Sequence, residues 1–271
     1  MRVGLITPRP DHPLLAATAA LLTPRHRVDW IDPADATGPR IPDTPADVYL
    51  LKARTAPALA LARALEERGA PVVNSSSATA LCQDRTLMAE LAVSAGLPFV
   101  GNRTVAKLQH LATEPELCYP LVVKSRHSRR GDLVARIDDA GRLHDLCGQW
   151  ADEPVVVQPY TANDGWDRKL WVIGRQVFAA LRRSELAGDP SAGRETVSLP
   201  LHELPEEWLE MARGIGPLFE LEVYGVDLID AGGNTPRIVD VNAFPGVRGQ
   251  AGAPEALTAL VLRTAEEQGG G

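Results

Sequence analysis

The sequence predicts a mixed α/β (α+β) protein that begins with a small parallel α/β unit and continues with antiparallel strands and helices. Three observations support this fold class. Short apolar strands alternate with helical segments over the first 74 residues, at the spacing of a parallel α/β unit. Farther along the chain, pairs of strands are separated by short turns, which is typical of antiparallel hairpins. The 271 residues are 45% hydrophobic and 23% charged, which is ordinary for a globular protein with ample core.

The N-terminal unit is predicted to contain four strands and two helices. Its strands are expected at Val3–Ile6, Arg27–Ile31, Asp47–Leu51 and Pro71–Asn74, and its helices at Pro13–Leu22 and Ala56–Arg68. Residues 32–46 contain prolines at positions 33, 39, 42 and 45, which predicts a loop. In a parallel sheet of this kind, ligands bind beyond the carboxyl ends of the strands. We therefore expect a ligand near Thr7, Lys52 and Asn74.

The remaining residues are predicted to form antiparallel strands with packed helices. Ser77 or Thr79 is expected to cap a short helix, and a second helix is expected at Asp84–Ala95, before Gly96. Further strands are expected at Leu121–Lys124, Leu133–Ile137, Val155–Tyr160, Lys169–Ile173, Gln176–Leu181, Tyr224–Ile229 and Arg237–Val241. Further helices are expected at Asp139–Gln149, Pro205–Phe219 and Pro254–Glu267.

The bulk properties exclude several classes of protein. A net charge of −7 argues against binding to nucleic acid or to an anionic membrane surface. Charged residues or proline interrupt every apolar run before it reaches the length of a membrane span, and the N-terminus lacks the apolar core of a signal peptide. The three cysteines are odd in number and widely spaced, which indicates reduced thiols. We therefore expect a cytoplasmic protein.

The hairpin near the C-terminus carries a cluster of oxygen donors. Asp227 lies in its first strand, and Asp240 and Asn242 lie two residues apart in its second strand, so their side chains share a face. Carboxylate and amide oxygens of this kind are a plausible seat for Mg²⁺, which prefers one or two carboxylates together with substrate phosphates. The alternative is that Asp and Asn at strand ends are solvated turn formers.

Basic residues occur at several places that would face such a site. Lys124 ends the apolar strand YPLVVK, and the loop Ser125–Gly131 that follows contains three arginines. These arginines are either solvated surface residues or part of a mobile flap that closes on anionic groups. Lys169 and Arg182 lie on neighbouring strands of a predicted hairpin, where charges among apolar residues line either a cleft or an exposed sheet face.

Several familiar motifs do not occur in the sequence. There is no G-x-x-x-x-G-K-[ST] loop, no G-x-G-x-x-G after a strand and no G-x-S-x-G elbow. The six histidines show no zinc spacing. A metal site in this protein is therefore expected to use oxygen ligands.

Seven motifs between about residues 70 and 250 nevertheless occur in a specific order. They are NSSSATALCQDRTLMAELAVSAGLP, YPLVVKS, VVVQPY, DRKLWVIG, FAALRRS, VYGVDLID and DVNAFPG. Each motif is weak alone, but in this order they resemble an ATP-grasp enzyme. The resemblance implies an ATP-grasp fold preceded by a small parallel α/β domain. It divides the chain into an N-terminal domain (residues 1–78), a small subdomain with the flap loop (79–160) and a C-terminal lobe with the metal site (161–271).

The resemblance also implies how ATP is held. Lys124 and Lys169 would contact the ATP phosphates, and the segment formed by Gln158, Pro159 and Tyr160 would hold adenine. The metal ligands and the residues assigned to the reacting end of the site follow from the same resemblance. Asp227, Asp240 and Asn242 would carry Mg²⁺, or alternatively Mn²⁺, with Asn242 also counted among the nucleotide-binding residues; Lys169 and Arg182 would be catalytic; Arg129, Arg130 and Arg248 would contact substrate.

Two branches of the superfamily compete on this evidence. The first contains ligases similar to the ribosomal-protein glutamate ligases and the lysine-biosynthesis ligases, in which an acyl phosphate is captured by an amine. The second contains the inositol polyphosphate kinases, whose ending resembles DVNAFPG and whose Asp matches Asp240. The flap loop lacks the histidine–glycine pattern of those kinases, and the compact length suits a ligase. Arg85 stands where many ligases have Lys, so no nucleotide role is carried over to it.

The sequence therefore predicts a cytoplasmic ATP-grasp ligase that joins a carboxylate to an amine and releases ADP and phosphate. Its expected partners are small-molecule or peptide carboxylates and amines, with no nucleic acid or membrane, and a homo-oligomer is allowed. The alternative is an ATP-dependent kinase of inositol phosphates or another small molecule on the same fold. A non-catalytic binding module is a third reading, disfavoured because all three oxygen donors of the hairpin are present.

Overall fold

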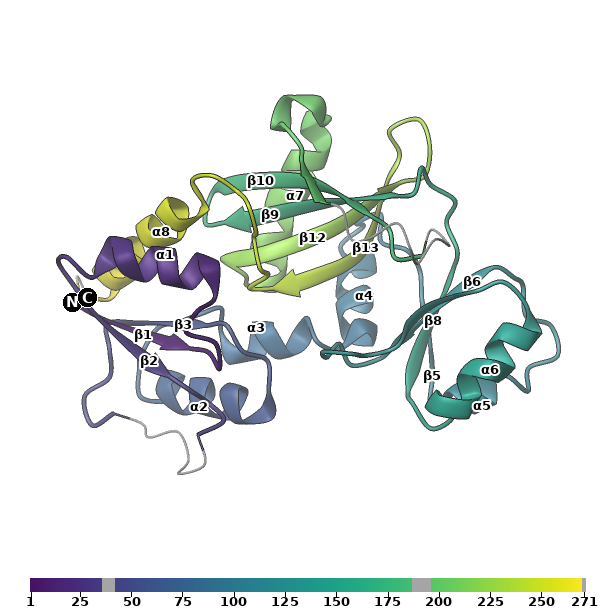
Figure 1. The fold of residues 1–271 in the computed structure, drawn as a ribbon, viewed down its shortest axis with the longest axis horizontal. Helices are drawn as coiled ribbons and strands as arrows, with labels where there is room; N and C mark the ends of the chain where they lie inside the picture. The colour runs from purple at the N-terminus through teal and green to yellow at the C-terminus, as the bar shows by residue number, and fades with distance from the viewer. Residues whose placement is uncertain (36–41, 187–195, 270–271) are drawn as a thin grey trace.

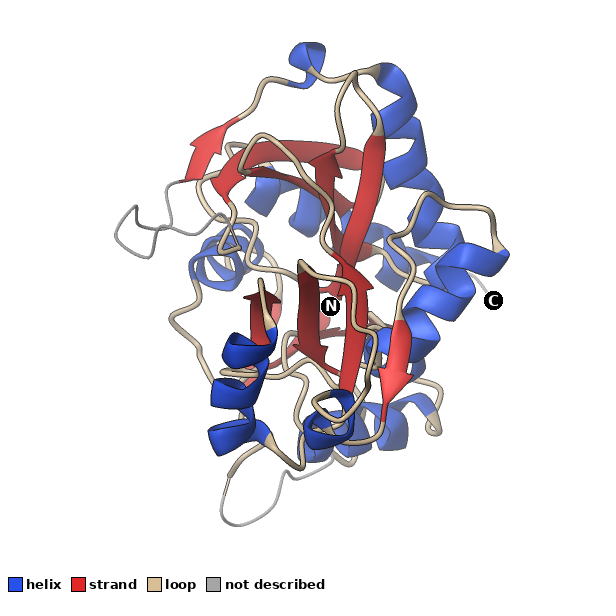
Figure 2. Ribbon diagram, turned by 90° about the vertical axis from the view of Figure 1, so that its right-hand side faces the viewer, coloured by secondary structure: helices blue, strands red, loops and turns tan. Residues whose placement is uncertain are grey.

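The computed structural model describes residues 1–35, 42–186 and 196–269. Within these ranges it contains three β-sheets (Figure 1). Helices lie on both sides of the strands (Figure 2). The predicted α/β (α+β) class is confirmed.

The N-terminal sheet is parallel and has the strand order β2-β1-β3-β4. Its strands are β1 (Arg2–Ile6), β2 (Arg27–Ile31), β3 (Val48–Leu51) and β4 (Val72–Val73), and its helices are α1 (Pro13–Leu22) and α2 (Ala56–Glu66). Strand β3 is buried along its whole length, as expected for a central parallel strand. The parallel unit predicted from the sequence is thus present. Part of the predicted 32–46 loop lies outside the described residues.

The central sheet is antiparallel and has the strand order β11-β10-β9-β12-β13. Its strands are β9 (Trp166–Ile173), β10 (Gln176–Arg183), β11 (Thr196–Ser198), β12 (Val223–Asp230) and β13 (Pro236–Ala243). The two predicted hairpins correspond to β9–β10 and β12–β13 and supply four of its five described strands. Helices α4 (Arg85–Ser94) and α7 (Glu206–Phe219) pack on one face, and a 3₁₀ turn, η1 (Leu201–Glu203), precedes α7.

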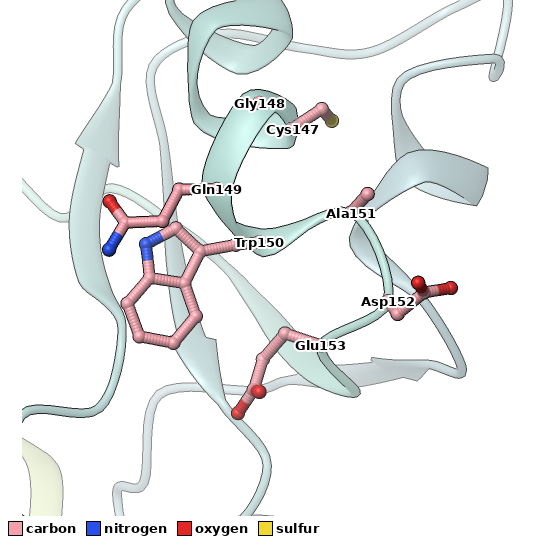
Figure 3. Close-up of a pocket in the computed structure, with 7 residues that line it drawn as sticks. All are labelled: Cys147, Gly148, Gln149, Trp150, Ala151, Asp152 and Glu153. Atoms are coloured by element: carbon pink, nitrogen blue, oxygen red, sulfur yellow. The ribbon is translucent and has the colours of Figure 1, made fainter.

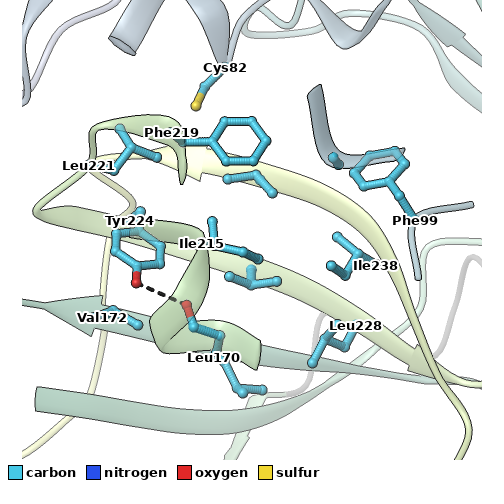
Figure 4. Packing of buried hydrophobic residues seen from close by; sticks show 14 of the residues in the cluster. Cys82, Phe99, Leu170, Val172, Ile215, Phe219, Leu221, Tyr224, Leu228 and Ile238 are labelled. Atoms are coloured by element: carbon cyan, nitrogen blue, oxygen red, sulfur yellow. Dashed lines mark hydrogen bonds between the residues drawn. The ribbon is translucent and has the colours of Figure 1, made fainter. Parts of the chain in front are cut away.

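Strand alternation gives this sheet one apolar face and one charged face. Leu170 of β9 and Val226 of β12 are fully buried in the core that the sheet shares with α4 and α7. Figure 4 shows this core, where Tyr224 also donates a hydrogen bond of 2.9 Å to the carbonyl of Ala212. Because successive side chains in a strand point to opposite faces, Lys169 and Asp227 project from the other face.

The third sheet is antiparallel, with the order β5-β8-β6-β7. Its strands are β5 (Arg103–Val105), β6 (Leu121–Ser125), β7 (Val134–Ile137) and β8 (Val155–Pro159), and its helices are α5 (Leu108–Leu111) and α6 (Ala140–Trp150). These elements enclose a hydrophobic core of their own. The short elements α5, β11 and η1 are absent from the sequence prediction because three or four residues carry too little periodicity.

The boundary between the N-terminal unit and the rest of the chain differs slightly from the prediction. Helix α3 (Ser76–Leu81) is capped by Ser75, whose Oγ accepts from the backbone N–H of Ala78 at 3.1 Å. Ser77 and Thr79 lie inside the helix, so the predicted cap was wrong by two residues or more. The domain boundaries at residues 78 and 160 stay a prediction.

Two features join the N-terminal sheet to the central sheet. Helix α8 (Ala253–Gly269) packs against α1 and β9 and contributes to a core shared by both sheets. Asn74, directly after β4, is buried and bonds to the start of β12: its Oδ1 accepts from the N–H groups of Glu222 (2.8 Å) and Val223 (3.0 Å), and its Nδ2 donates to the Val223 carbonyl (2.6 Å). Among the described helices, none is long and apolar enough to cross a membrane.

Replacing Asn74 with alanine should destabilise this junction. The change removes three hydrogen bonds and leaves the buried N–H of Val223 without its partner. We expect the free energy of unfolding to fall by about 2 to 3 kcal/mol, since a buried unsatisfied donor costs about 1–3 kcal/mol. Denaturant titration followed by circular dichroism measures the change.

Asn102→Ala is the matched control, because the Asn102 side chain donates one hydrogen bond of 3.0 Å, to the Arg85 carbonyl. This variant should lose only about 1 kcal/mol. Equal losses in the two variants would contradict a special role for Asn74.

Candidate functional site

A cleft of about 1560 Å³ lies where the three sheets meet. This is larger than the roughly 300–1,000 Å³ that encloses one drug-sized ligand, so there is room for two ligands side by side. All twelve residues to which the ATP-grasp resemblance assigns a role line the cleft: Lys124, Arg129, Arg130, Gln158, Pro159, Tyr160, Lys169, Arg182, Asp227, Asp240, Asn242 and Arg248. The fold thus brings together residues from two sheets and three loops. The individual roles given to them stay predictions.

Three charged side chains form one row across the central sheet. Lys169 of β9 is in register with Asp227 of β12, which is in register with Asp240 of β13. The Nζ of Lys169 lies 2.8 Å from Asp227 Oδ2 and 3.3 Å from Asp167 Oδ2. We call Lys169, Asp227 and Asp240 the charged row. Its order follows directly from strand pairing, because residues paired across antiparallel strands present their side chains on the same face.

The electrostatics of the charged row follow from burial and neighbouring charges. Burial opposes the charge on Lys169, but Asp227 and Asp167 outweigh this effect and raise the pKa of Lys169. Burial, together with the nearby Asp240 carboxylate, raises the pKa of Asp227 although Lys169 opposes this. A carboxylate whose charge is disfavoured by burial and by a neighbouring carboxylate would be stabilised by a cation.

Lys124 reaches the charged row from the third sheet. It ends the apolar part of β6, is buried, and donates from Nζ to the carbonyl of Val239 on β13 at 2.9 Å. Burial lowers the pKa of Lys124 to about 8, against the opposing effect of Asp240. No carboxylate among the described residues lies within 4.0 Å of this ammonium. Lys124 is therefore a buried cation whose close partner in the described part of the chain is a carbonyl.

The oxygen donors of the hairpin fit a magnesium ion. The described residues include no group of three His, Cys, Asp or Glu side chains arranged to hold a metal. A metal here would therefore use the two carboxylates of Asp227 and Asp240 with the amide of Asn242, which lies on the same face of β13. This donor set leaves coordination positions for phosphate and water, as Mg²⁺ requires.

Arg85 is part of the site although the sequence left its role open. Its guanidinium is buried, donates from Nη1 to Asp132 and to the Ser125 carbonyl (both 2.7 Å), and lies 3.6 Å from Asp240. Arg85 thus connects the charged row to the base of the flap loop, Ser125–Gly131. In the sequence, Arg85 directly follows the helix cap Asp84. This position indicates the start of a helix but does not reveal the long-range partners of Arg85.

The flap loop is tied to the start of α4. Asp84 forms an ion pair of 2.7 Å with Arg126, and the backbone N–H of Ser128 donates to the Gln83 carbonyl at 2.8 Å. Arg129 makes two bonds to Glu153, at 2.7 and 2.8 Å. For Arg130, no carboxylate among the described residues lies within 4.0 Å. The two arginines therefore differ, and Arg130 is the one whose charge is available to a ligand.

The segment predicted to hold adenine forms the end of β8. The Gln158 side chain is buried and donates from Nε2 to the Val100 carbonyl at 3.4 Å. The backbone N–H of Tyr160 donates to the Pro120 carbonyl at 3.2 Å, and Arg136 stacks over the Tyr160 ring, 4.0 Å from its centroid. Opposite this segment, Arg182 projects from β10 and pairs with Glu185 at 3.1 Å.

The N-terminal unit contributes more to the cleft than the sequence indicated. Lys52, directly after β3, lines the cleft as expected. Asn74 does not, because its side chain is used by β12, so the prediction of a ligand near Asn74 is wrong. Thr7 is buried and accepts from the Arg9 N–H at 3.2 Å. Three unpredicted residues line the same side: Arg9, His12 and Arg54. The sequence signal that could have found Arg9 and Arg54 is the occurrence of cations shortly after apolar parallel strands, as in TPRP and LKAR.

A second, smaller hollow lies outside the site. It is formed by consecutive residues 147–153 at the end of α6 (Figure 3). Two of its acidic residues are already paired, Asp152 with Lys107 and Glu153 with Arg129. Cys147 is half-buried at the edge of this hollow, and Cys82 is buried in the main core, where burial raises its pKa to about 12. These thiols are not poised for reaction.

The RimK-like ATP-grasp domain matches residues 99–253, more than half of the chain. N-acetylaspartylglutamate synthase A of Homo sapiens is 27% identical over 196 residues, which cover 68% of this chain and 49% of that protein. A probable alpha-L-glutamate ligase of Rhodopirellula baltica is 33% identical over 106 residues, covering 37% of this chain and 25% of that protein. The matches thus span about half or less of these relatives.

The fold is shared over nearly the whole chain. The crystal structure of a RimK domain ATP-grasp protein from Sphaerobacter thermophilus aligns with a TM-score of 0.73 at 21% identity, and the alignment covers 97% of this chain and 99% of that chain. The predicted ATP-grasp fold is confirmed. The matched residues 99–253 include Lys124, Gln158 and the whole charged row. The chain belongs to the RimK-like ATP-grasp family.

Proposed function

We propose that this protein is an ATP-dependent carboxylate–amine ligase. It would form an amide or peptide bond through an acyl phosphate and release ADP and phosphate. The proposal rests on the convergence of two lysines from different sheets on the Asp227–Asp240 pair: Lys124, which is buried, and Lys169, whose side chain is 11% exposed. Phosphoryl transfer needs positioning and neutralisation of phosphate charge rather than a covalent protein group, and these residue types supply both.

The residues would divide the work between charge neutralisation and metal binding. Lys124 and Lys169 are the proposed phosphate ligands, and Gln158–Tyr160 the proposed adenine segment. Asp227, Asp240 and Asn242 would hold Mg²⁺, with Mn²⁺ as the alternative. When bound, such a metal neutralises and orients phosphate oxygens. On binding, the ion pair between Lys169 and Asp227 would break. Asp227 would then bind the metal, and Lys169 would bind a phosphate.

The acceptor side of the cleft would be formed by arginines and the flap loop. Arg182 would stabilise the transferring phosphoryl group or orient the acceptor carboxylate. The flap loop, held to α4 by Asp84 and Gln83, is the proposed lid that keeps water from the acyl phosphate.

The names of the relatives support a ligase over a kinase. One relative is an N-acetylaspartylglutamate synthase and another a probable glutamate ligase. By analogy with them, small-molecule or peptide carboxylates and amines are the proposed substrates. A homo-oligomer and a cytoplasmic location stay predictions.

Product stoichiometry tests the reaction type. A panel of amino acids, short peptides and inositol phosphates is incubated with ATP and Mg²⁺, and ADP, phosphate and product mass are measured. A ligase releases one phosphate for each ADP, and its product lacks a phosphate group. ADP without free phosphate, and a product heavier by one phosphate, would instead establish the kinase alternative.

Asp240→Asn tests the metal assignment. The change keeps the shape of the side chain but removes one of two metal-binding charges, so we expect ADP formation to fall by at least about 100-fold. Thermal melting checks that the fold is retained. Asp230→Asn, at the turn end of the same hairpin, is the matched control and should keep full activity. Unchanged turnover in Asp240→Asn would refute the metal site.

Arg130→Ala and Arg129→Ala test the flap loop. Because Arg129 is held by Glu153 and Arg130 is not, Arg130→Ala should have the larger effect. We expect it to raise the substrate KM or lower kcat by about tenfold, equivalent to about 1.4 kcal/mol. Steady-state kinetics with the best substrate of the panel measures both constants. If neither variant changes them, the loop is a solvated surface.

A further inference from the structure

Four cations gather at the end of the cleft formed by the N-terminal unit. They come from three loops that follow β1, β3 and β13, far apart in the sequence. We call them the basic cluster: Arg9, Lys52, Arg54 and Arg248. All four line the cleft, and Lys52 lies over the ring of Phe244, 5.7 Å from its centroid. Phe244 follows Asn242 by two residues, so the basic cluster adjoins the metal end of the site.

The basic cluster has no balancing acid in the described part of the chain. None of its four members has a described carboxylate within 4.0 Å, whereas many other arginines of this acidic protein are paired with one. The one polar side-chain contact described for its arginine members is weak, 3.4 Å from Arg54 Nη1 to the Ser128 hydroxyl. Like charges held together without counter-charge repel one another and destabilise the fold.

Two further groups show the effect of this unbalanced charge. Burial, and then the other members of the basic cluster, lower the pKa of Lys52 to about 8. His12 is 4% exposed, and its Nδ1 has no hydrogen-bond partner. Burial and the nearby cations lower the pKa of His12 to about 4, so its ring is neutral at pH 7. The Nδ1 of this neutral imidazole is thus a polar atom whose hydrogen-bonding capacity is unused.

We infer that the basic cluster, together with His12, is a binding subsite for the non-reacting end of the substrate, and that this end carries at least two negative charges. This inference rests on the proposed ligase function, because it assigns one part of the same cleft. Two or more carboxylates, or a phosphate group, have the required chemistry.

The charge count decides against a single carboxylate. Arg9, Arg54 and Arg248 carry three guanidinium charges, and Lys52, whose pKa is about 8, is also mainly charged at pH 7. One carboxylate would leave most of this charge unbalanced, whereas a dianion or trianion could pair with guanidinium groups from opposite sides of the cleft. A substrate held here by its far end would direct its reacting group toward Asn242 and the charged row.

Direct binding tests the subsite without nucleotide turnover. The full chain, without ATP or magnesium, is titrated calorimetrically with tricarballylate, inorganic phosphate and butyrate. We expect tricarballylate or phosphate to bind at least about tenfold more tightly than butyrate. The better of the two probes distinguishes carboxylates from a phosphate group as the natural ligand. Equal affinity for all three probes would overturn the inference.

Variants then locate the binding. The double variant Arg9→Gln/Arg54→Gln should lose at least about tenfold in affinity for the better probe, whereas Arg25→Gln, an exposed arginine on the same unit, should not. With tricarballylate as the probe, Lys169→Met should also retain the affinity, because Lys169 belongs to the separate, proposed phosphate site. Affinity that survives in the double variant, or that disappears in Lys169→Met, would overturn the assignment. Failure of the ligase proposal would appear separately, as absence of ADP formation.

Lys52→Met adds a readout that a purely structural lysine would not give. The ordinary pKa of 10.5 applies in the unfolded chain and about 8 in the folded chain, so the unfolded state binds more protons between these values. Lys52 therefore makes stability rise with pH over this window. Lys124 makes a similar contribution, which remains in the Lys52→Met variant. The variant should show a smaller rise and a higher Tm at pH 7, while probe affinity falls. A lower Tm with unchanged affinity would contradict the subsite.

Discussion

The structure depends on keeping buried opposite charges paired within the cleft. Removing an ion from water costs several kcal/mol even after relaxation, so each buried charge needs a close counter-charge or dipole. Strand register supplies the first pair, because Lys169 and Asp227 are opposite each other on β9 and β12. Arg85, from α4, lies 3.6 Å from Asp240, and a backbone carbonyl is the close partner of Lys124. Asp240 and Lys124 are thus less completely paired than Asp227 and Lys169. Under the proposed function, this leaves Asp240 available to a metal ion and Lys124 to a phosphate.

These same residues join the third sheet to the rest of the molecule. The third sheet has its own hydrophobic core, separate from that of the central sheet. Its strand β6 contacts the middle of β13 through the Lys124 ammonium, which donates to the Val239 carbonyl at 2.9 Å, and the segment that leads into β5 pairs with Ile238 through Pro98 and Val100, also at 2.9 Å. An attachment made of hydrogen bonds rather than continuous apolar packing exposes little apolar area when it rearranges.

Sequence patterns predicted those parts of the site that depend on local order. The two-residue spacing of Asp240 and Asn242, within a strand of alternating apolar residues, correctly indicated a shared face. The elements with clear periodicity, such as the helix that begins after Thr55, were also predictable. Long-range partners were not: no local signal shows that Arg85 meets Asp132, or that Asn74 bonds to β12 instead of a ligand. The basic cluster was missed for the same reason, since Arg9 and Arg248 are 239 positions apart in the sequence and meet only after the sheets have packed.

The distribution of charge along the cleft constrains how a substrate can lie in it. In one part of the cleft, the Asp240 carboxylate disfavours the ionisation of Asp227, and in the adjoining part the basic cluster lacks described counter-charges. A ligand made of anions alone would balance only the charge of the basic cluster, and a metal ion alone would balance only the charge of the two aspartates. A metal-bound polyphosphate beside an acidic substrate satisfies both, because the metal neutralises the aspartates while the far end of the substrate neutralises the cations. The reacting group must then lie between them, near Asn242 and Phe244, where the chain leaves the sheet. Full occupancy is also the state in which the charges of the cleft are most nearly balanced, so each ligand lowers the electrostatic cost of binding the other.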